Sequence, residues 1–382
     1  MPTRQPKNVM IIAGEASGDL HGAMLVKALH RKERRLFVYG IGGEAMRAAG
    51  VRIVIDAATL SVVGITEVLS RLAVLKRAVN TARQMLRRLS PDLLILIDFP
   101  DFNLYVAAEA RRRGIPVLYY ISPQLWAWRS GRVKKIRRLV DHMAVILPFE
   151  ADFYRRWRVP VSFVGHPLLD HGAPPVAEDE HWRRSRVIGL LPGSRDGEVA
   201  RHLPIMLKAA GRLAERQPDL RFLVSIAPGV SDTVVRGAVA AGGMPPGTEM
   251  LNGGMRRILS ESRMVMAVSG TVTLETGISG MPMVIIYRVS PVSYLLGRLL
   301  IRVDHIGLVN LIAGRRVVPE LIQHDANPET IARTVAAMLA DPRRLEEMRD
   351  QLLNTRNLLG GPGASDRVAD IALAMLAGDR RS

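Results

Sequence analysis

The tetrapeptide Pro-Gly-Ser-Arg, residues 192–195, directly follows the apolar run Val187–Leu191. A glycine here lets backbone N–H groups approach an anion, while Ser194 adds a hydroxyl and Arg195 adds a forked, permanent cation. Gly193, Ser194 and Arg195 therefore predict a phosphate-binding loop. The same residues are also typical of an ordinary strand-to-helix turn, so this loop alone leaves both interpretations open.

A second loop suited to an anion follows the run Val265–Val268. Ser269, Gly270 and Thr271 can begin a helix whose free N–H groups and dipole favour a negative charge. Glu275 lies one turn further on, where a carboxylate can accept both hydroxyls of a ribose. A serine cap with a nearby glutamate is common by itself, but two such loops after neighbouring strands favour a diphosphate ligand. Neither loop has the spacing of a Walker or GxGxxG motif.

The first half of the chain carries a loop of small residues after the run Val9–Ile12. Glu15, Ser17, Gly18 and Asp19 lie in it, at the start of a helical pattern. Such a loop suits the close approach of a substrate.

A carboxylate stands at the end of another buried run, Leu93–Ile97, where Asp98 follows directly. A general base belongs at such a position, at the carboxyl end of a strand in a dry cleft. An Asx turn ahead of Pro100 is the structural alternative. We favour Asp98 over Asp101 as the base because Asp98 continues the strand.

Two of the four tryptophans, Trp126 and Trp128, follow the run Val117–Ile121 and precede Arg129. Six of the ten residues from Arg129 to Arg138 are basic. Aromatic rings beside cations can hold sugar rings, acyl chains or a membrane interface. Packing of both indoles into the core is equally consistent with this sequence.

These loops need parallel strands to position them, and the chain supplies nine short apolar runs separated by helical patterns. Near-continuous apolar strands between helices indicate parallel sheets that are buried on both faces. The sequence therefore predicts an α/β protein with two Rossmann-like, doubly wound domains that face a central cleft. Besides the five runs named above, the remaining runs are Leu36–Val38, Met143–Leu147, Phe222–Ile226 and Met283–Tyr287.

The polar stretch Asp170–Arg186 contains two prolines and lacks periodicity, so we expect it to be the linker. We place the domains at residues 1–168 and 169–350, with C-terminal helices at 351–382 that pack back on the first domain or exchange in a dimer. Near the end of the chain, Asn327 predicts a helix cap, and Ser365 predicts the cap of a last helix that ends at Leu376.

The formal net charge of +17, from 53 basic and 36 acidic residues, predicts a polyanionic partner. The stretch Arg71–Leu89 alternates basic with apolar residues and suits an anionic membrane surface, although a solvated helix face has a similar pattern. The chain has no cysteine, no apolar run long enough to cross a membrane and no signal-peptide core. We therefore expect a cytoplasmic protein with no metal and no cofactor.

Several of these segments together resemble the lipid-A-disaccharide synthase family. The resemblance runs in family order over roughly residues 8 to 320, and the Trp-Ala-Trp-Arg segment is its most specific part. The matching segments are Gly14–Asp19, Gly64–Leu69, Asp98–Asn103, Ser122–Trp128, Leu147–Glu150, Leu191–Arg195, Ser269–Thr271 and Asn310–Gly314.

The resemblance implies a GT-B fold and an inverting transfer. In it, 2,3-diacylglucosamine passes from UDP to the 6-hydroxyl of 2,3-diacylglucosamine 1-phosphate, which gives a β-1,6-linked disaccharide 1-phosphate and UDP. It implies that Asp98 and Arg195 are catalytic and that Gly193, Ser194, Ser269, Gly270, Thr271, Glu275 and Asn310 also bind the donor. Two further loops are assigned to the acceptor: the small-residue loop after Val9–Ile12 and the tryptophan loop after Val117–Ile121. Their assigned residues are Glu15, Ser17, Gly18, Asp19, Trp126, Trp128 and Arg129.

This family assignment implies a peripheral protein on the inner face of the inner membrane, with a homodimer as a further possibility. By its residue type alone, an asparagine in apolar surroundings such as Asn310 is more typical of a hydrogen-bonded structural residue. Two rival functions are a nucleotide-sugar epimerase of the same fold and a nucleic-acid-binding protein. The epimerase leaves the basic, apolar N-terminal half unexplained, and no nucleic-acid-binding signature is present.

Overall fold

The computed structural model describes residues 6–60, 68–126, 130–170, 179–290, 294 and 304–378. The chain forms two compact units. The first comprises residues 1–171 together with 359–382, and the second comprises residues 172–358. The C-terminal segment thus belongs to the first unit, although it follows the second in sequence.

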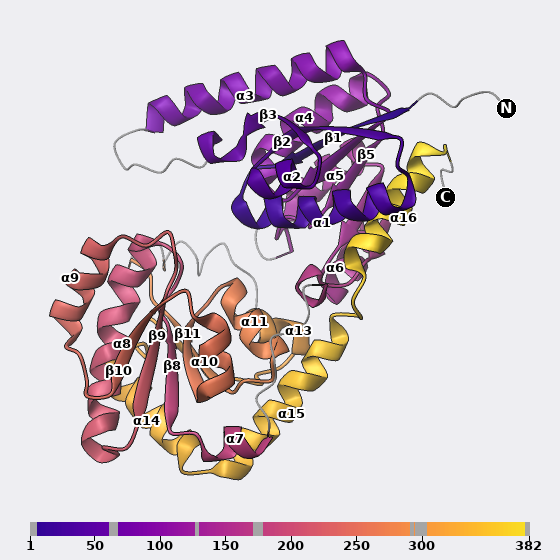
Figure 1. The fold of residues 1–382 in the computed structure, drawn as a ribbon. Coiled ribbons are helices and arrows are strands. Elements are labelled where there is room, and N and C mark those ends of the chain that lie inside the picture. Colours follow the sequence, from indigo (N-terminus) through magenta and orange to yellow (C-terminus); the bar gives the residue numbers. More distant parts are fainter. Residues whose placement is uncertain are drawn as a thin grey trace. The chain divides into compact units, whose positions relative to one another are not determined.

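The first unit is built on a parallel sheet of seven strands in the order β3-β2-β1-β4-β5-β6-β7 (Figure 1). The chain starts in the middle of this sheet, winds outward to β3, and returns to the other side of β1 to form β4. The strands are β1 (Lys7–Ala13), β2 (Leu36–Gly42), β3 (Arg52–Asp56), β4 (Leu93–Ile97), β5 (Val117–Tyr120), β6 (His142–Val145) and β7 (Val161–Phe163).

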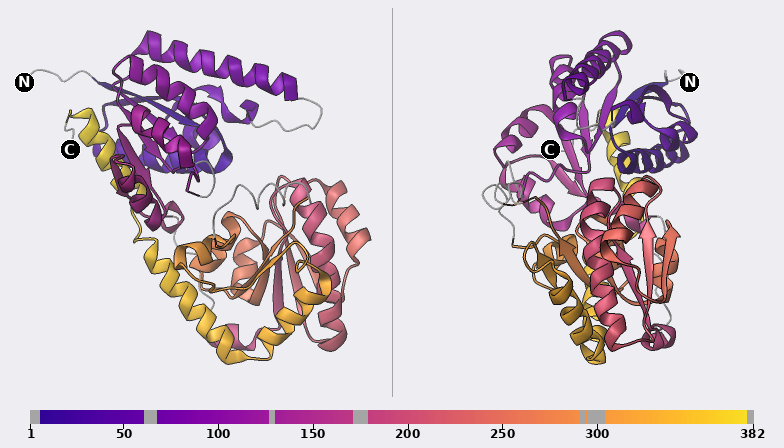
Figure 2. Two further views of the ribbon diagram at one scale, coloured as in Figure 1. Left: turned by 180° about the vertical axis from the view of Figure 1, so that it is seen from behind. Right: turned by 90° about the vertical axis from the view of Figure 1, so that its left-hand side faces the viewer.

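Helices cover both faces of this sheet, so alternate residues of each strand enter two different cores. In β5, Tyr119 joins the core that also takes in residues of α3, α4, α5 and α6. Its neighbour Tyr120 joins the opposite core, with residues of α1 and α16 (Figures 1 and 2). The helices are α1 (Ala16–Lys32), α2 (Glu44–Ala48), α3 (Val68–Leu89), α4 (Pro100–Arg112), α5 (Val133–Leu139), α6 (Pro148–Arg156) and α16 (Ala364–Leu376).

The second unit repeats the plan with a parallel sheet in the order β10-β9-β8-β11-β12-β13. Its strands are β8 (Val187–Leu191), β9 (Arg221–Ile226), β10 (Thr248–Asn252), β11 (Ser262–Val268), β12 (Met283–Tyr287) and β13 (Glu320–Ile322). Its helices are α7 (Asp179–Arg184), α8 (Asp196–Arg216), α9 (Asp232–Gly242), α10 (Met255–Glu261), α11 (Thr271–Ile278), α13 (Leu308–Ala313), α14 (Pro328–Leu339) and α15 (Pro342–Leu358).

The two doubly wound sheets confirm the predicted fold class, and each of the nine apolar runs overlaps a strand. The described residues add four strands that the sequence did not reveal: β3, β7, β10 and β13. All four are edge strands. Most of their residues are only partly buried, so they lack the continuous apolar run that marks a central strand.

The predicted linker is partly structured, which corrects our expectation. Residues 179–184 form α7, and Trp182 on it is buried in the second unit. The indole Nε1 of Trp182 donates to the carbonyl of Arg263 at 2.8 Å, and the guanidinium of Arg263 stacks on the ring at 4.2 Å. The short helix carries a single anchoring aromatic residue, so it gave no periodic signal.

The predicted cap of α14 is confirmed, because the side chain of Asn327 accepts the N–H of Thr330. The predicted cap of α16 is wrong. Ser365 lies inside that helix, and the carboxylate of Asp170 caps it from a distant part of the chain. Asp170 accepts the N–H groups of Gly363, Ala364 and Ser365 at 2.7–3.0 Å.

Within the first unit, α16 also packs along α1, where Arg31 pairs with Asp366 and Lys32 with Asp370. In the described part of the chain, no helix is both long and apolar enough to cross a membrane.

The Asp170 cap predicts a local loss of stability in Asp170→Ala. Three N–H groups at the start of α16 lose their acceptor. We therefore expect the local free energy of unfolding of α16 to fall by roughly 1–2 kcal/mol. Hydrogen exchange at residues 363–376 should then accelerate about tenfold. Asp370→Ala is the matched control, because it removes an ion pair whose aspartate is 63% exposed on the same helix. It should change exchange little, and equal effects of the two variants would contradict the cap.

Candidate active site

In both sheets the predicted loops lie where the strand order reverses. In the first unit, β1 and β4 are neighbours whose connections leave in opposite directions, and the same holds for β8 and β11 in the second unit. In open parallel sheets, ligands bind at the carboxyl ends of such strand pairs. The loops at residues 14–19 and 98–103 share one such position, and the loops at 192–195 and 269–275 share the other.

The backbone leaves β4 in a strained conformation. Asp98 and Phe99 have φ angles of 44° and 48°, so two consecutive residues with side chains adopt the left-handed region. Each such residue costs roughly 1–3 kcal/mol and persists only where the surroundings enforce it. The ring of Phe99 packs over Gly14, where a Cβ would lie 2.3 Å from the ring. The glycine after β1 therefore makes room for the turn after β4.

The carboxylate of Asp98 is partly buried beside Glu15. Burial, and then the negative charge of Glu15, raise the pKa of Asp98 from 3.8 to about 6. A carboxylate with such a pKa is a stronger base than a free aspartate and is still mostly ionised at neutral pH. Asp101, by contrast, has a side chain that is 70% exposed and pairs with Arg132 at 2.6 Å. Of the two carboxylates, only Asp98 combines partial burial with a raised pKa.

The small-residue loop after β1 divides into exposed and buried positions. Glu15 and Ser17 are exposed at the start of α1, whereas Gly18 and Asp19 are buried. The carboxylate of Asp19 accepts N–H groups of Gly43, Ala45 and Met46 and so caps α2. Its structural task is to hold the loop after β2, and its carboxylate is already satisfied by these three N–H groups.

The indole of Trp126 is anchored to the segment Leu147–Glu150. Its Nε1 donates to Glu150 at 3.0 Å, and its ring meets Phe149 edge to face at 4.9 Å. Glu150 is buried and also accepts the N–H of Leu147, and burial raises the pKa of Glu150 to about 7. No sequence pattern indicates this link between Trp126 and Glu150. Trp128 and Arg129 lie outside the described residues.

In the second unit, Glu198 closes the Pro-Gly-Ser-Arg loop. Its Oε2 accepts the N–H of Ser194 at 2.9 Å, and its Oε1 lies 3.6 Å from the guanidinium of Arg195. Gly193 has φ of 117°, and a Cβ there would lie 2.6 Å from Glu198. The loop thus already holds a carboxylate with its N–H group and cation, which is the chemistry that binds a phosphate. The spacing of Glu198 from Arg195, the first residue before α8, is that of a capping box.

The neighbouring loop after β11 presents the start of α11. Gly270 and Thr271 are exposed there, and the hydroxyl of Ser269 donates to the carbonyl of Ile306 at 3.2 Å. Glu275 lies one turn into the helix and is partly exposed. The free N–H groups of this helix end favour an anion.

Asn310 is fully buried, and its amide is satisfied by the protein itself. Its Nδ2 donates to Val318 and Glu320, and its Oδ1 accepts the N–H groups of Val317 and Val318. Glu320 also accepts the N–H groups of Ile306 and Gly307, the segment that holds Ser269. Asn310 therefore supports the loop after β11 indirectly, through Glu320 and the segment Ile306–Gly307.

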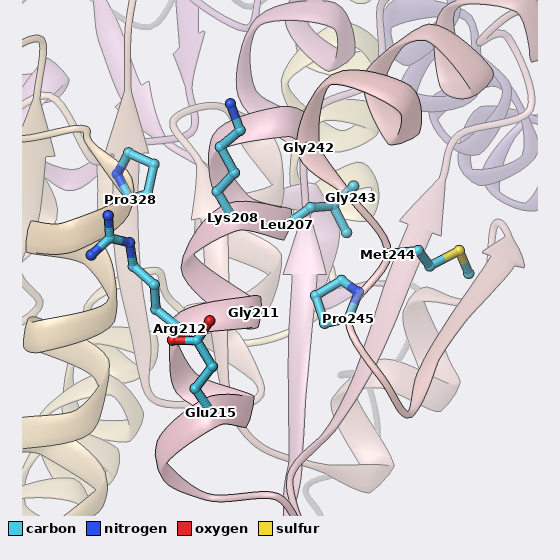
Figure 3. A pocket seen from close by; sticks show the side chains of 10 residues that line it. All are labelled: Leu207, Lys208, Gly211, Arg212, Glu215, Gly242, Gly243, Met244, Pro245 and Pro328. Carbon is cyan, nitrogen blue, oxygen red and sulfur yellow. The ribbon is translucent and has the colours of Figure 1, made fainter.

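A separate pocket of about 610 Å³ lies in the second unit (Figure 3). It holds none of the predicted site residues. Its lining comes from the second half of α8, the end of α9 and the start of α14, and consists of Leu207, Lys208, Gly211, Arg212, Glu215, Gly242, Gly243, Met244, Pro245 and Pro328. Elsewhere in the described residues, no three His, Asp or Glu side chains gather as a set of metal ligands.

Comparison with known proteins identifies related sequences over nearly the whole chain. The family model described as lipid-A-disaccharide synthetase matches residues 9–374. The lipid-A-disaccharide synthase of Geobacter sulfurreducens is 50% identical over 374 residues, which cover 96% of this chain and 97% of that protein. The enzyme of the same name from Syntrophus aciditrophicus is 49% identical, with 97% and 98% covered.

Solved structures with a similar fold are much more distant in sequence. The UDP-GlcNAc 2-epimerase of Neisseria meningitidis bound to UDP-GlcNAc has a TM-score of 0.67 at 13% identity, with 96% of this chain and 99% of that chain covered. The glycosyltransferase of kitacinnamycin has a TM-score of 0.66 at 15% identity, with 98% and 100% covered. At such identities the likeness concerns the fold, which is that of GT-B glycosyltransferases and epimerases.

The raised pKa of Asp98 predicts that this residue destabilises the fold at neutral pH. Its folded pKa of about 6 exceeds the ordinary 3.8, so the folded state binds the proton more tightly than the unfolded state. The protonated carboxyl of Asp98 therefore stabilises the folded state fully below about pH 4, and this stabilisation is lost as the pH rises to about 6. Asp98→Asn cannot ionise, so its free energy of unfolding should exceed the wild-type value by roughly 2–3 kcal/mol above pH 6 and approach it near pH 4.

Urea denaturation at a series of pH values measures this difference. Asp101→Asn is the matched control, because it removes an exposed, ion-paired carboxylate three residues away. The control should change the free energy of unfolding by less than about 1 kcal/mol. A wild-type protein as stable as Asp98→Asn at pH 8 would disprove the burial penalty.

Proposed function

Because the chain belongs to the lipid-A-disaccharide synthetase family, we propose that it is the glycosyltransferase that forms the lipid A disaccharide from a UDP-sugar donor. The observation that carries this function is the family match over residues 9–374, supported by relatives about 50% identical over almost their whole length. The epimerases share only the fold, at 13–15% identity, so the epimerase alternative is not favoured. The nucleic-acid alternative is likewise not favoured by these relatives.

The finer proposal concerns both substrates. The donor is UDP-2,3-diacylglucosamine, and the acceptor is 2,3-diacylglucosamine 1-phosphate. The first unit binds the acceptor through Glu15, Ser17, Gly18 and the tryptophan loop, to which Trp126, Trp128 and Arg129 belong. The second unit binds UDP.

On the donor side, the diphosphate lies against the hydroxyl of Ser194, the guanidinium of Arg195 and the helix start at Gly270 and Thr271. Arg195 suits this role because its side chain is 77% exposed and its ion pair with Glu198 is long, at 3.6 Å. Glu275 receives the ribose hydroxyls, while Asn310 holds the loop after β11 in place.

On the acceptor side, the carboxylate of Asp98 removes the proton of the 6-hydroxyl. The oxygen attacks the anomeric carbon of the donor from the face opposite UDP, so a new C–O bond forms as the bond to the diphosphate breaks. Arg195 and the N–H groups stabilise the charge that develops on the leaving UDP.

Activity with purified substrates tests the proposal. The protein should release UDP and form the disaccharide 1-phosphate when both lipids are present, and neither product when the acceptor is omitted. Asp98→Asn should lower kcat by about 10²–10⁴ because it removes the general base. Arg195→Ala should lower kcat by about 10²–10³ because it removes a preorganised charge.

Arg212→Ala is the control for Arg195→Ala, since Arg212 lies on α8, the helix that follows Arg195, but lines the separate pocket. It should keep full turnover. Normal turnover in Arg195→Ala would rule out the leaving-group role, and epimerised UDP-sugar without disaccharide would rule out the synthase.

We further propose that the first unit binds the inner face of the inner membrane peripherally. Helices α3, α4 and α5 pack in succession on one face of its sheet (Figure 1). Apolar side chains are exposed among their cations, with Leu89 48% and Tyr105 54% exposed, and Lys135 lies over the ring of Tyr105 at 5.0 Å. Exposed cations of α3 and α5 are Lys76, Arg77, Arg87, Arg88, Lys134, Lys135, Arg137 and Arg138. The patch at Val62–Gly64 lies outside the described residues.

Co-sedimentation with vesicles tests the membrane proposal. The protein should bind vesicles that contain phosphatidylglycerol and should not bind neutral phosphatidylcholine vesicles. Changing Lys134, Lys135, Arg137 and Arg138 to Gln should weaken binding by about 1 kcal/mol per residue. The control variant changes four exposed cations of the second unit, Lys208, Arg212, Arg216 and Arg236. Equal loss in both variants, or no preference for anionic lipid, would refute this surface.

A further inference from the structure

The backbone carbonyl of Asp98 accepts two side-chain hydrogen bonds. The hydroxyl of Tyr119 donates to it at 2.6 Å, and Nδ2 of Asn103 donates at 2.5 Å. The same Nδ2 lies 3.2 Å from the carbonyl of Ile97, so it spans the last two carbonyls before the turn. Tyr119 comes from β5 and Asn103 from α4, so two separate elements hold one peptide group.

This peptide group joins the two residues in the left-handed region, Asp98 and Phe99. Its orientation sets the direction in which the Cα–Cβ bond of Asp98 leaves the backbone. Because each left-handed residue is intrinsically unfavourable, the turn would relax without partners that favour it. The Phe99 ring over Gly14 restrains one side of the peptide, and the two donors restrain its carbonyl oxygen.

Both donors are held in place by burial and by backbone hydrogen bonds of their own elements. Tyr119 is fully buried in β5 and pairs in register with Leu96 of β4. Its burial, and the nearby charge of Asp98, raise the pKa of Tyr119 well above its usual value, so the hydroxyl remains a donor. Asn103 is fully buried, and its backbone N–H donates to Phe99 at 3.1 Å.

The amide of Asn103 turns its Nδ2 group toward the two carbonyls of Ile97 and Asp98. Its Oδ1 has no hydrogen bond to the described residues and therefore does not hold the amide in this orientation. Holding the Asp98 carbonyl is the task that this orientation serves.

We propose that Tyr119 and Asn103 are positioning residues that fix the peptide group of Asp98 and thereby aim its carboxylate at the acceptor hydroxyl. The inference rests on the proposed role of Asp98 as the base. It accounts for the asparagine that ends the segment Asp98–Asn103, to which the mechanism itself gives no role.

Tyr119→Phe tests the proposal, because it removes one hydroxyl and leaves the ring in the core. A base displaced by a fraction of an ångström should lower kcat about tenfold or more, while KM for either substrate changes less than about twofold. Tyr120→Phe is the matched control: Tyr120 is the next residue of β5, is equally buried, and faces the opposite core. It should keep the wild-type kcat. Thermal unfolding of both variants checks that their folds are equally intact.

A double variant separates positioning from other effects. In the Asp98→Asn background, Tyr119→Phe should cause no further loss of kcat, because the group that it positions is gone.

Asn103→Asp is a second, isosteric variant that turns an oxygen toward the carbonyls and should also lower kcat with little change in KM.

The outcomes distinguish this inference from the proposed function. A wild-type kcat in Tyr119→Phe, an equal loss in Tyr120→Phe, or an additive loss in the Asp98→Asn background would overturn the positioning role. Full turnover in Asp98→Asn alone would instead overturn the proposed base, whatever Tyr119 does.

Discussion

The order of strands in each sheet is the constraint on which the other features of the site depend. Each unit begins with a central strand, winds to one edge, and then crosses back to continue on the other side. Connections after the two central strands therefore diverge and leave their carboxyl ends uncovered. The loops at residues 14–19 and 98–103 follow β1 and β4 in one unit, and those at 192–195 and 269–275 follow β8 and β11 in the other. Within each unit, the two loops lie near each other because the winding makes the strands before them neighbours.

Carboxylates organise both sites, and most of them act on the backbone. Asp19, Asp170, Glu150 and Glu198 each accept one or more main-chain N–H groups near a loop of the site or the start of a helix. This use of acidic residues stabilises helix starts that would otherwise carry unsatisfied donors. In a chain with a formal charge of +17, Glu198 also places negative charge beside a cation, the guanidinium of Arg195. Glu198 shows the consequence most directly, because it offers the phosphate-suited loop an internal carboxylate.

Asp98 combines features that oppose stability and suit the base that is proposed for this position. It is partly buried next to another carboxylate, and its backbone is left-handed together with that of Phe99. Each feature is unfavourable by itself, and the fold supplies the compensation through Gly14, Tyr119 and Asn103. The compensation comes from β1, β5 and α4, so the geometry of one carboxylate depends on the packing of the whole centre of the sheet.

The sequence by itself determined the central strands, the fold class and the loops that carry the chemistry. Central strands of parallel sheets are apolar on both faces, and the residues after them, such as Asp98 and Arg195, are adjacent in sequence to the strands that place them. The edge strands β3, β7, β10 and β13 were not predicted, because their partial exposure removes the apolar run. Confirmation of the family came from the relatives and not from the fold, which epimerases share.

Only the tertiary structure decided which partners the polar side chains have. The cap of α16 comes from Asp170, 193 residues before Gly363, and no local pattern reports such a pair. Nor does sequence distinguish Tyr119, which holds the Asp98 carbonyl, from Tyr120, which enters the opposite core. The alternation of side chains along a strand assigns them to opposite faces. Which face meets Asp98 is set by the register of β5 against β4 and by the helices that cover each side.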